Sequence, residues 1–429
     1  VTFKSLLGKG KKRKKSLSEV DSSVREQYCK DDVEYTYGLY KHYSTNPNPF
    51  FTLIEGRLTD VVVDMECSGF TVDQQQLQSL RIYLEAERDT VVKKYPGINL
   101  NSPKQVLEAM IARGYSRELS LYASHGQATS TNKLILRSMA QQVTMASDIL
   151  RHRTVGKLLS SYVVPMTGVT TLRGSFNQVG TKTGRFSSSK PNLQQVPKRS
   201  KDGLLVRKCL VPRPDHVFVV SDLSQIEPRL YAQASRDPRL LQVFRTGGDF
   251  HALVTQAMFG RVSISKDERQ VGKVLGLSML YGAGTRRLLE TLVKEGILNI
   301  TEADVESFRR KVTSTFRHAF MWSRQYQYGA RKAGCVRTLL GRVIPWGPGR
   351  FNATNTLIQG SQADVLKVCL VNLKAEGLLV VCTVHDEVVV ECPTLLAVDV
   401  RGTVHRTMES SVTLRDVPVK AETRTVGSW

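Results

Sequence analysis

The most informative segment of the sequence reads His216-Val-Phe-Val-Val-Ser-Asp-Leu-Ser-Gln-Ile-Glu-Pro-Arg229. Its apolar, β-branched first half predicts a buried strand, and the remainder predicts a turn into a helix. Asp222 falls where this strand ends. A carboxylate at the end of an apolar strand is costly unless it is solvated, paired or bound to metal. Asp222 is therefore a candidate metal ligand, and the alternative is that it caps the following helix.

A second acidic turn lies nearer the C-terminus. The segments Val380–Val384 and Val388–Val390 predict two apolar strands, with His385-Asp386-Glu387 at the tip between them. If both acidic tips lie on neighbouring strands, their carboxylates can hold two Mg²⁺ ions about 3.5–4 Å apart, an arrangement that stabilises the attacking and leaving oxygens in phosphoryl transfer. The alternative is that Asp386 is an ordinary turn residue.

A third element is a helix predicted over residues 267–281. Arg269, Lys273, Leu277 and Tyr281 recur every four residues, and steps of about 400° keep them on one slowly drifting face. Two cations followed by a tyrosine can clasp a triphosphate and stack on its base. The alternative is an amphipathic helix whose cations only extend over its surface.

The composition agrees with a partner that carries phosphates. The 61 Lys and Arg residues outnumber the 39 Asp and Glu residues, so the 429-residue chain has a formal charge of +22. This excess favours polyphosphate binding, although scattered surface cations would give the same charge. Seven cysteines without a C-x-x-C pair argue against a zinc ribbon or a disulfide framework. No apolar run approaches the ~18 residues of a membrane span.

The rest of the chain alternates helical patterns with short strands. Helical periodicity is present over Leu17–Tyr43, from Leu58 to a strand near Gly69–Asp73, onward to about residue 165, over 230–335, and from Gly360 to about Ala375. This order predicts an α+β fold, in which a small antiparallel sheet carries large helical insertions.

The motifs together resemble those of family A DNA polymerases, the DNA polymerase I-like enzymes. Asp222–Arg229 resembles their motif A, Arg269–Gly282 their motif B and Val384–Glu387 their motif C. Thr181–Pro197 is similar to a further family stretch. The resemblance implies a right-hand fold with an antiparallel palm sheet, helical fingers and a helical thumb.

The resemblance also implies domain boundaries. They are a C-terminal remnant of a 3′–5′ exonuclease-like domain at 1–50, the start of the palm and the thumb at 51–172, palm at 173–229, fingers at 230–349 and palm at 350–429. Tyr28 and Asp32 match the third exonuclease motif, but the earlier Asp-x-Glu motif is absent, so proofreading is not expected. The compact helical region over 70–165 favours a phage or viral type.

The reaction implied by the resemblance is attack of a primer 3′-OH on the α-phosphate of a deoxynucleoside triphosphate, with release of pyrophosphate. Two Mg²⁺ ions, for which Mn²⁺ can substitute, would be held by Asp222, Asp386 and the Leu223 carbonyl. Lys273 and Glu387 complete the expected catalytic set. The expected nucleotide-binding residues are Gln225, Glu227, His251, Arg269, Lys273, Leu277 and Tyr281. The expected DNA-binding residues are Arg185, Asn192, Gln194, Arg199, Asn355, Gln359 and His385.

The expected partners are primer-template DNA and deoxynucleoside triphosphates. No membrane is expected, and replication accessory proteins stay unspecified. We expect a monomer in the cytoplasm of a bacterium or of a phage-infected cell, and not a secreted protein.

Two rival functions depend on the same residues. The nearest is a single-subunit RNA polymerase, and Glu227 argues against it because the family uses this position to exclude ribonucleotides by bulk. The other is a non-catalytic DNA-binding subunit, which joint retention of Asp222, Asp386 and Lys273 disfavours. Leu277 departs from the family's usual Phe or Tyr. Its side chain offers no hydroxyl or flat face to the sugar, which predicts strong rejection of dideoxynucleotides.

Overall fold

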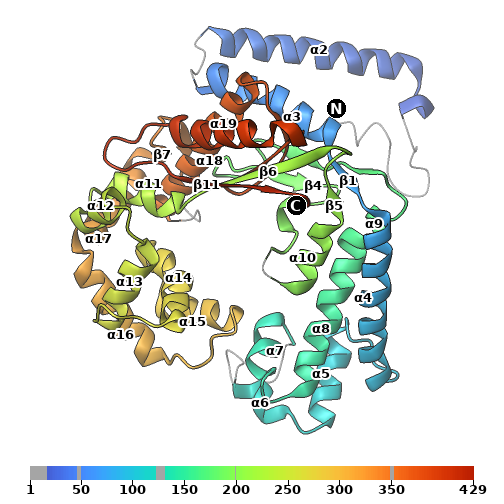
Figure 1. Cartoon of the computed structure of the whole chain (residues 1–429), viewed down its shortest axis with the longest axis vertical. Helices are drawn as coiled ribbons and strands as arrows, with labels where there is room; N and C mark the ends of the chain where they lie inside the picture. Colours follow the sequence, from blue (N-terminus) through green and yellow to red (C-terminus); the bar gives the residue numbers. More distant parts are fainter. Residues whose placement is uncertain (1–16, 46–49, 122–130, 199, 348–351) are drawn as a thin grey trace. The chain divides into compact units, whose positions relative to one another are not determined.

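Figure 1 shows a computed structural model of the chain, which describes residues 17–45, 50–121, 131–198, 200–347 and 352–429. The chain divides into two compact units, Val1–Gly56 and Arg57–Trp429. Among the described helices, none is both long and apolar enough to cross a bilayer. The predicted α+β class is confirmed, because helices surround sheets whose strands all pair antiparallel.

The first unit contains the helix predicted near its start. Its elements are η2 (Leu17–Glu19), α2 (Ser22–Ser44) and η3 (Phe51–Glu55). Asp21 caps α2 by accepting a hydrogen bond from the Ser23 amide. Tyr28 and Asp32 lie one turn apart on α2, and their hydrogen bond raises the pKa of Tyr28.

The second unit begins with a series of helices, some of which pack into the main core and some of which build a smaller apolar cluster. Its elements are α3 (Gly56–Ser68), β1 (Phe70–Val72), α4 (Gln74–Lys94), α5 (Pro103–Ala112), α6 (Ser116–Leu121), α7 (Lys133–Met139), α8 (Thr144–Leu158), η4 (Leu159–Val163) and α9 (Val164–Met166). Helices α4 and α8 run side by side (Figure 1). Val106, Met110, Leu136 and Ile149 belong to a buried cluster between α5, α7 and α8.

Short strands lead from these helices to the central sheet. In chain order, these strands and two intervening helices are β2 (Thr171–Leu172), β3 (Ser175–Asn177), β4 (Ser187–Ser189), η5 (Leu193–Gln195), α10 (Lys201–Lys208) and β5 (Leu210–Val211). Strand β1 pairs with both β2 and β5. Strands β3 and β4 pair with each other, so the loop between them, which contains Arg185, is the turn of a hairpin.

The central sheet has the order β11-β6-β10-β9. Its strands are β6 (His216–Leu223), β9 (Leu379–Val384), β10 (Glu387–Pro393) and β11 (Ala421–Val426). Helices α18 (Ala353–Ala375) and α19 (Ala397–Ser410), the latter preceded by η6 (Thr394–Leu396), lie on the same side of this sheet (Figure 1). The expected start of α18 after Gly360 is wrong, because the helix begins at Ala353 and runs through Gly360.

A group of helices is inserted between β6 and α18. It consists of α11 (Ile226–Ser235), α12 (Pro238–Arg245), α13 (Phe250–Phe259), α14 (Lys266–Leu280), α15 (Thr285–Lys294), α16 (Glu302–Thr315) and α17 (Arg317–Ala333), followed by the hairpin of β7 (Cys335–Arg337) and β8 (Val343–Pro345). The helix predicted over 267–281 is confirmed as α14. Its start is fixed by a capping box between Ser265 and Glu268.

The central sheet and the three-stranded sheet of β2, β1 and β5 meet at an aromatic cluster. Phe70 of β1 contacts Phe218 of β6 edge-on at 5.4 Å and stacks on Trp429 at 5.0 Å. The Arg207 guanidinium also lies against Trp429, 3.9 Å from the centre of its ring. This packing holds Trp429 next to Glu387, the first residue of β10.

Candidate active site

The pairing of β6 with β10 brings the two acidic turns together. Asp222 lies opposite Glu387 in the register, and the Leu223 amide donates to the Asp386 carbonyl at 3.2 Å. His385 forms the hairpin tip with a left-handed φ of 60°. The predicted neighbouring tips are therefore confirmed. The helix-cap alternative for Asp222 is wrong, because the residue at the N-cap of α11 is Gln225.

The carboxylates of Asp222 and Asp386 repel each other electrostatically, and both are partly buried. Burial and the neighbouring Asp222 raise the pKa of Asp386 to about 7, and burial also raises the pKa of Asp222. The Asp222 Oδ1 atom is buried without a hydrogen-bond partner. Two dehydrated carboxylates with an unpartnered oxygen fit a divalent cation that takes oxygen ligands.

The described residues supply only part of a coordination shell. Among them, no group of three or more His, Cys, Asp or Glu side chains is arranged to hold a metal ion. Mg²⁺ commonly keeps several waters and binds through one or two carboxylates plus substrate phosphates. The Asp222–Asp386 pair fits this mode of binding.

This repulsion gives the pair a measurable effect on stability. In EDTA at pH 8, Asp386→Asn should raise the melting temperature by about 2–5 °C, because it removes one of two repelling carboxylates. The folded-state pKa of Asp386 is raised, so protonation relieves the repulsion as the pH falls, and the advantage of the variant shrinks between pH 7 and pH 4. Adding Mg²⁺ should raise the melting temperature of the wild type more than that of the variant.

Differential scanning fluorimetry measures these effects. Asp399→Asn, an exposed change on α19, is the matched control. A wild-type chain that responds neither to Mg²⁺ nor to the Asp386 substitution would contradict a cation site.

Glu387 is held by protein partners. Its side chain is only 3% exposed; its Oε1 accepts from Trp429 Nε1 at 3.3 Å and lies 3.7 Å from Arg207 Nη1. Lys198 and Arg424 lie 3.9 Å and 3.8 Å from its Oε2. The geometry gives Glu387 a structural function, and a role at the primer terminus or a metal stays a prediction. The motif itself did not indicate these partners.

The cation face of α14 is joined to α13. Arg269 Nε donates to Asp249 Oδ2 at 2.9 Å, and Asp249 also caps α13 by accepting from the His251 amide at 2.9 Å. Burial opposes it, but the Arg269 hydrogen bond lowers the pKa of Asp249. Lys273 is exposed and has no carboxylate partner among the described residues. Asp249 was missed, although its place just before a helix marks it as a cap.

His251 lies near both cations of α14. Burial lowers its pKa, and Lys273 and Arg269 lower it further against the effect of Asp249. A neutral imidazole at neutral pH can donate a hydrogen bond to a phosphate but carries no full charge. Its Nδ1 is buried without a hydrogen-bond partner.

Glu227 connects motifs that are far apart in the sequence. The Tyr281 hydroxyl donates to Glu227 Oε2 at 2.9 Å, and Arg185 Nη2 donates to both Glu227 and Gln362. Asn352 fixes the other end of Tyr281, because its Nδ2 donates to the Tyr281 carbonyl at 2.9 Å. Burial and Glu227 raise the pKa of Tyr281 well above its usual value. Gln362 and Asn352 were missed, because no local pattern distinguishes them.

The other predicted residues are more dispersed. Tyr162 donates to the Asn192 carbonyl at 3.3 Å, Gln194 donates to the Thr383 carbonyl at 3.4 Å, and Gln225 Oε1 accepts from the Phe250 amide at 3.1 Å. The Oδ1 atoms of Asn192 and Asn355 are buried without a hydrogen-bond partner, Leu277 and Gln359 are half-buried, and His385 is exposed. Arg199 lies outside the described residues.

Comparisons with known proteins identify the family of the chain. The family model described as DNA polymerase family A matches residues 71–429. The chain is 30% identical over 438 residues to DNA polymerase I of Chloroflexus aurantiacus, covering 92% of this chain and 45% of that protein. It is 30% identical over 410 residues to DNA polymerase I of Geobacillus stearothermophilus, covering 88% and 45%. The chain thus spans about half the length of the curated relatives it matches.

A solved structure has the same fold. It is the POL domain of Pol1 from M. smegmatis, in complex with DNA primer-template and dNTP. The TM-score is 0.78 at 25% sequence identity, and the match covers 88% of this chain and 70% of that chain.

Proposed function

The chain belongs to DNA polymerase family A, and on this premise we propose that it catalyses template-directed DNA synthesis. The reaction adds deoxynucleotides to a primer 3′-OH and releases pyrophosphate. The observation that carries this proposal is the β6–β10 register, which pairs Asp222 with Glu387 at the ends of the two inner strands, so that Asp386, the residue before Glu387, interacts with Asp222. The relatives' names and the substrates in the Pol1 structure support the same function.

The proposed catalytic roles are those that the family resemblance implies, and the chemistry of the side chains is compatible with them. Asp222, Asp386 and the Leu223 carbonyl would hold two Mg²⁺ ions, or Mn²⁺ in their place. Such ions supply Lewis-acid stabilisation of the phosphoryl group and lower the pKa of the attacking hydroxyl. Lys273 would neutralise the triphosphate and give a proton to the leaving pyrophosphate.

The nucleotide would lie along the face of α14. Arg269 and His251 would bind its phosphates beside Lys273, with Arg269 already oriented by Asp249. Tyr281 would stack near the templating pair. Gln225 would support this site by joining the start of α11 to α13.

The primer-template would contact residues from the palm and the hairpin tips. We assign this role to Arg185, Asn192, Gln194, Arg199, Asn355, Gln359 and His385, with Glu387 supporting the strand end. Contacts in the minor groove suit an enzyme that copies any sequence, because that groove has a degenerate pattern. We further propose palm, fingers and thumb at the predicted boundaries, a monomeric enzyme of phage type, and an exonuclease remnant over residues 1–50.

A primer-extension assay tests the proposed function directly. A labelled primer annealed to a longer template, with Mg²⁺ and four deoxynucleotides, should be extended to the template end. Extension should stop at a defined template base when the complementary nucleotide is omitted. A chain that binds the primer-template but never extends it would instead support the non-catalytic rival.

Glu227 is expected to exclude ribonucleotides. Glu227→Ala should reduce the preference for deoxy- over ribonucleotides about 10- to 100-fold, because it removes the bulk proposed to face the sugar C2′ position. Glu227→Gln, which keeps the bulk and can still accept from Tyr281, should retain the preference. The ratio of kcat/KM values for the two nucleotide types measures the effect. An unchanged ratio in the Ala variant would count against the role.

Leu277 is expected to cause poor use of dideoxynucleotides. Leu277→Tyr should raise dideoxynucleotide incorporation about tenfold or more, because a hydroxyl on this face of α14 can hydrogen-bond the nucleotide. Competition between dideoxy- and deoxynucleotides in primer extension measures the change. Leu277→Met, which adds no hydroxyl, is the control, and efficient termination by the wild type would refute the explanation.

A further inference from the structure

Arg185 is presented by a short turn between β3 and β4. The Gly184 amide donates to the Thr181 carbonyl at 3.1 Å, and Thr181 Oγ1 donates to the Arg185 carbonyl at 2.9 Å. These bonds fix the turn internally. They do not by themselves fix the position of the turn relative to Glu227, the residue that Arg185 contacts.

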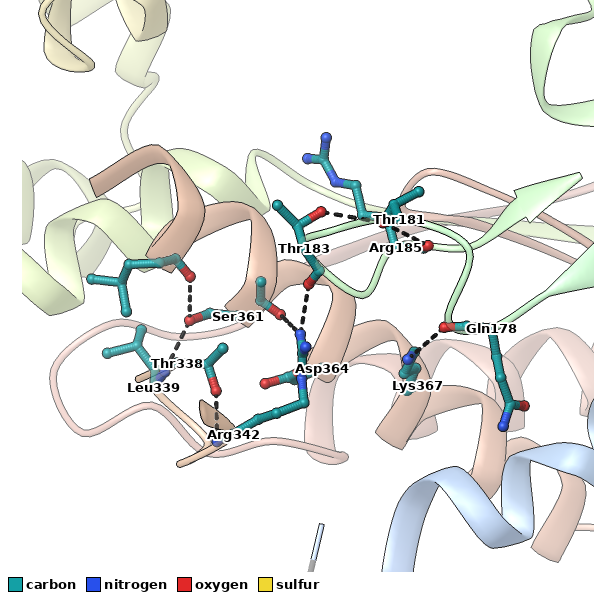
Figure 2. Close-up of polar contacts among 12 residues, drawn as sticks. Gln178, Thr181, Thr183, Arg185, Thr338, Leu339, Arg342, Ser361, Asp364 and Lys367 are labelled. Carbon is teal, nitrogen blue, oxygen red and sulfur yellow. Dashed lines mark hydrogen bonds and ion pairs between the residues drawn. The ribbon is translucent and has the colours of Figure 1, made fainter. Parts of the chain in front are cut away.

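Arg342 supplies an external anchor. Its Nε donates to Asp364 Oδ1 at 2.6 Å, and its Nη2 donates to the Thr183 carbonyl at 2.7 Å and to the Gly360 carbonyl at 3.2 Å. The Asp364 side chain is fully buried and that of Arg342 is 16% exposed. Figure 2 shows the Arg342 guanidinium between Asp364 and Thr183, with the Arg185 side chain pointing away from it.

The turn is shaped to receive this guanidinium. Gly184 has a φ of 85°, and a Cβ atom there would lie 2.6 Å from Arg342 Nη2. The glycine therefore serves both the backbone conformation and the close approach of Arg342. A second anchor lies earlier in the loop, where Lys367, which is fully buried, donates to the Gln178 carbonyl at 2.9 Å.

Arg342 is itself held in place. It lies in the turn between β7 and β8, where its amide donates to Thr338 Oγ1 at 3.0 Å. The next contact is with α18, because the Leu339 amide donates to Ser361 Oγ at 2.9 Å (Figure 2). The β7–β8 turn is thus docked on the helix that also carries Asp364.

We propose that Arg342 is a positioning residue, which acts through the Thr183 carbonyl to hold Arg185 against Glu227 and Gln362. This inference rests on the proposed function, since its catalytic consequence requires that Arg185 contacts primer-template DNA. It extends that function by assigning a task to a residue outside the proposed substrate- and metal-binding set. The task requires arginine, because only the guanidinium fork can reach a carboxylate and two carbonyls at once.

A lysine at this position separates charge from geometry. Arg342→Lys keeps a cation beside the buried Asp364, so the chain should stay folded, but one amine cannot keep all three contacts. Because small displacements of a positioned group are costly, kcat/KM for nucleotide addition should fall about 10- to 100-fold. Arg213→Lys is the matched control, because Arg213 also pairs with a buried carboxylate, that of Glu391, 2.9 Å away.

A double-mutant cycle with Arg185 tests the path of the effect. If Arg342 acts through Arg185, then Arg342→Lys should cause no further loss of kcat/KM in an Arg185→Ala background. Losses that multiply would show that Arg342 acts independently of Arg185 and would overturn the proposal. An Arg342→Lys chain as active as the wild type would also overturn it.

Hydrogen exchange gives a readout that does not depend on activity. In Arg342→Lys, exchange of the Gly184 amide should be at least about tenfold faster than in the wild type, whereas Arg213→Lys should not change it. Unchanged exchange would refute the clamp. Faster exchange in a chain whose wild type extends no primer would support the clamp and refute the proposed function, so the two failures are distinguishable.

Discussion

Asp222→Asn is expected to lower the rate of primer extension at least ~10³-fold in Mg²⁺. The side chain keeps its size, so β6 and its neighbours should be unaffected, but one of the two carboxylates proposed to hold the metal ions loses its charge. Metal-assisted phosphoryl transfer depends on charge that is positioned where the transition state develops it, and such terms are worth several kcal/mol. Single-turnover extension of a labelled primer measures the loss.

Two controls separate chemistry from folding and binding. Asp399→Asn, exposed on α19, should extend primers at the wild-type rate. Fluorescence anisotropy should show that Asp222→Asn still binds the primer-template, because removing a negative charge does not weaken attraction to phosphates. If Asp222→Asn extends primers at more than a tenth of the wild-type rate, Asp222 does not hold an essential ion.

Glu387→Ala is expected to lower the free energy of unfolding by about 3–5 kcal/mol. The loss leaves the Arg207 guanidinium, whose side chain is 6% exposed, without its carboxylate and leaves Trp429 Nε1 without an acceptor. An uncompensated buried charge is among the costliest defects that a single substitution can make. Urea unfolding followed by tryptophan fluorescence measures the change, and Arg207→Met combined with Glu387→Leu should recover most of it.

Glu422 offers a matched control on the same sheet. It lies opposite Asp222 on β11 but is exposed, so Glu422→Ala should change the free energy of unfolding by less than about 1 kcal/mol. Equal effects of both substitutions would refute a structural function of Glu387. Full stability of Glu387→Ala with a large loss of kcat would favour the catalytic role that the sequence predicts.

The elements predicted well from the sequence are those with a clear periodicity. The β-branched run before Asp222 and the four-residue repeat of α14 each encode one element and the side-chain directions along it. The start of α18 was missed because Gly360 looks like a helix breaker. The structure explains this glycine by packing, since a Cβ there would lie 2.7 Å from Ile344 Cδ1.

The contacts around the site were harder to predict than the residues that make them. The sequence predicts Arg269 as a phosphate ligand, but it does not predict the pairing of Arg269 with Asp249. Glu387 belongs to a motif that the sequence shows, but the sequence does not predict the cations that pair with it. In each case the residue type indicates which interaction is possible, and the partner depends on how distant elements pack.

The sequence alone determined the family, the class of fold, and the local geometry of the acidic turns and the cation face. Period and motif spacing suffice there, because backbone geometry fixes where residues a few positions apart must lie. Only the tertiary structure decided that Arg185 meets Glu227 across 42 residues, that Tyr281 meets Glu227 across 54, and that Arg342 meets Thr183 across 159. No local rule relates such pairs, because their separation in space is set by the packing of every element between them.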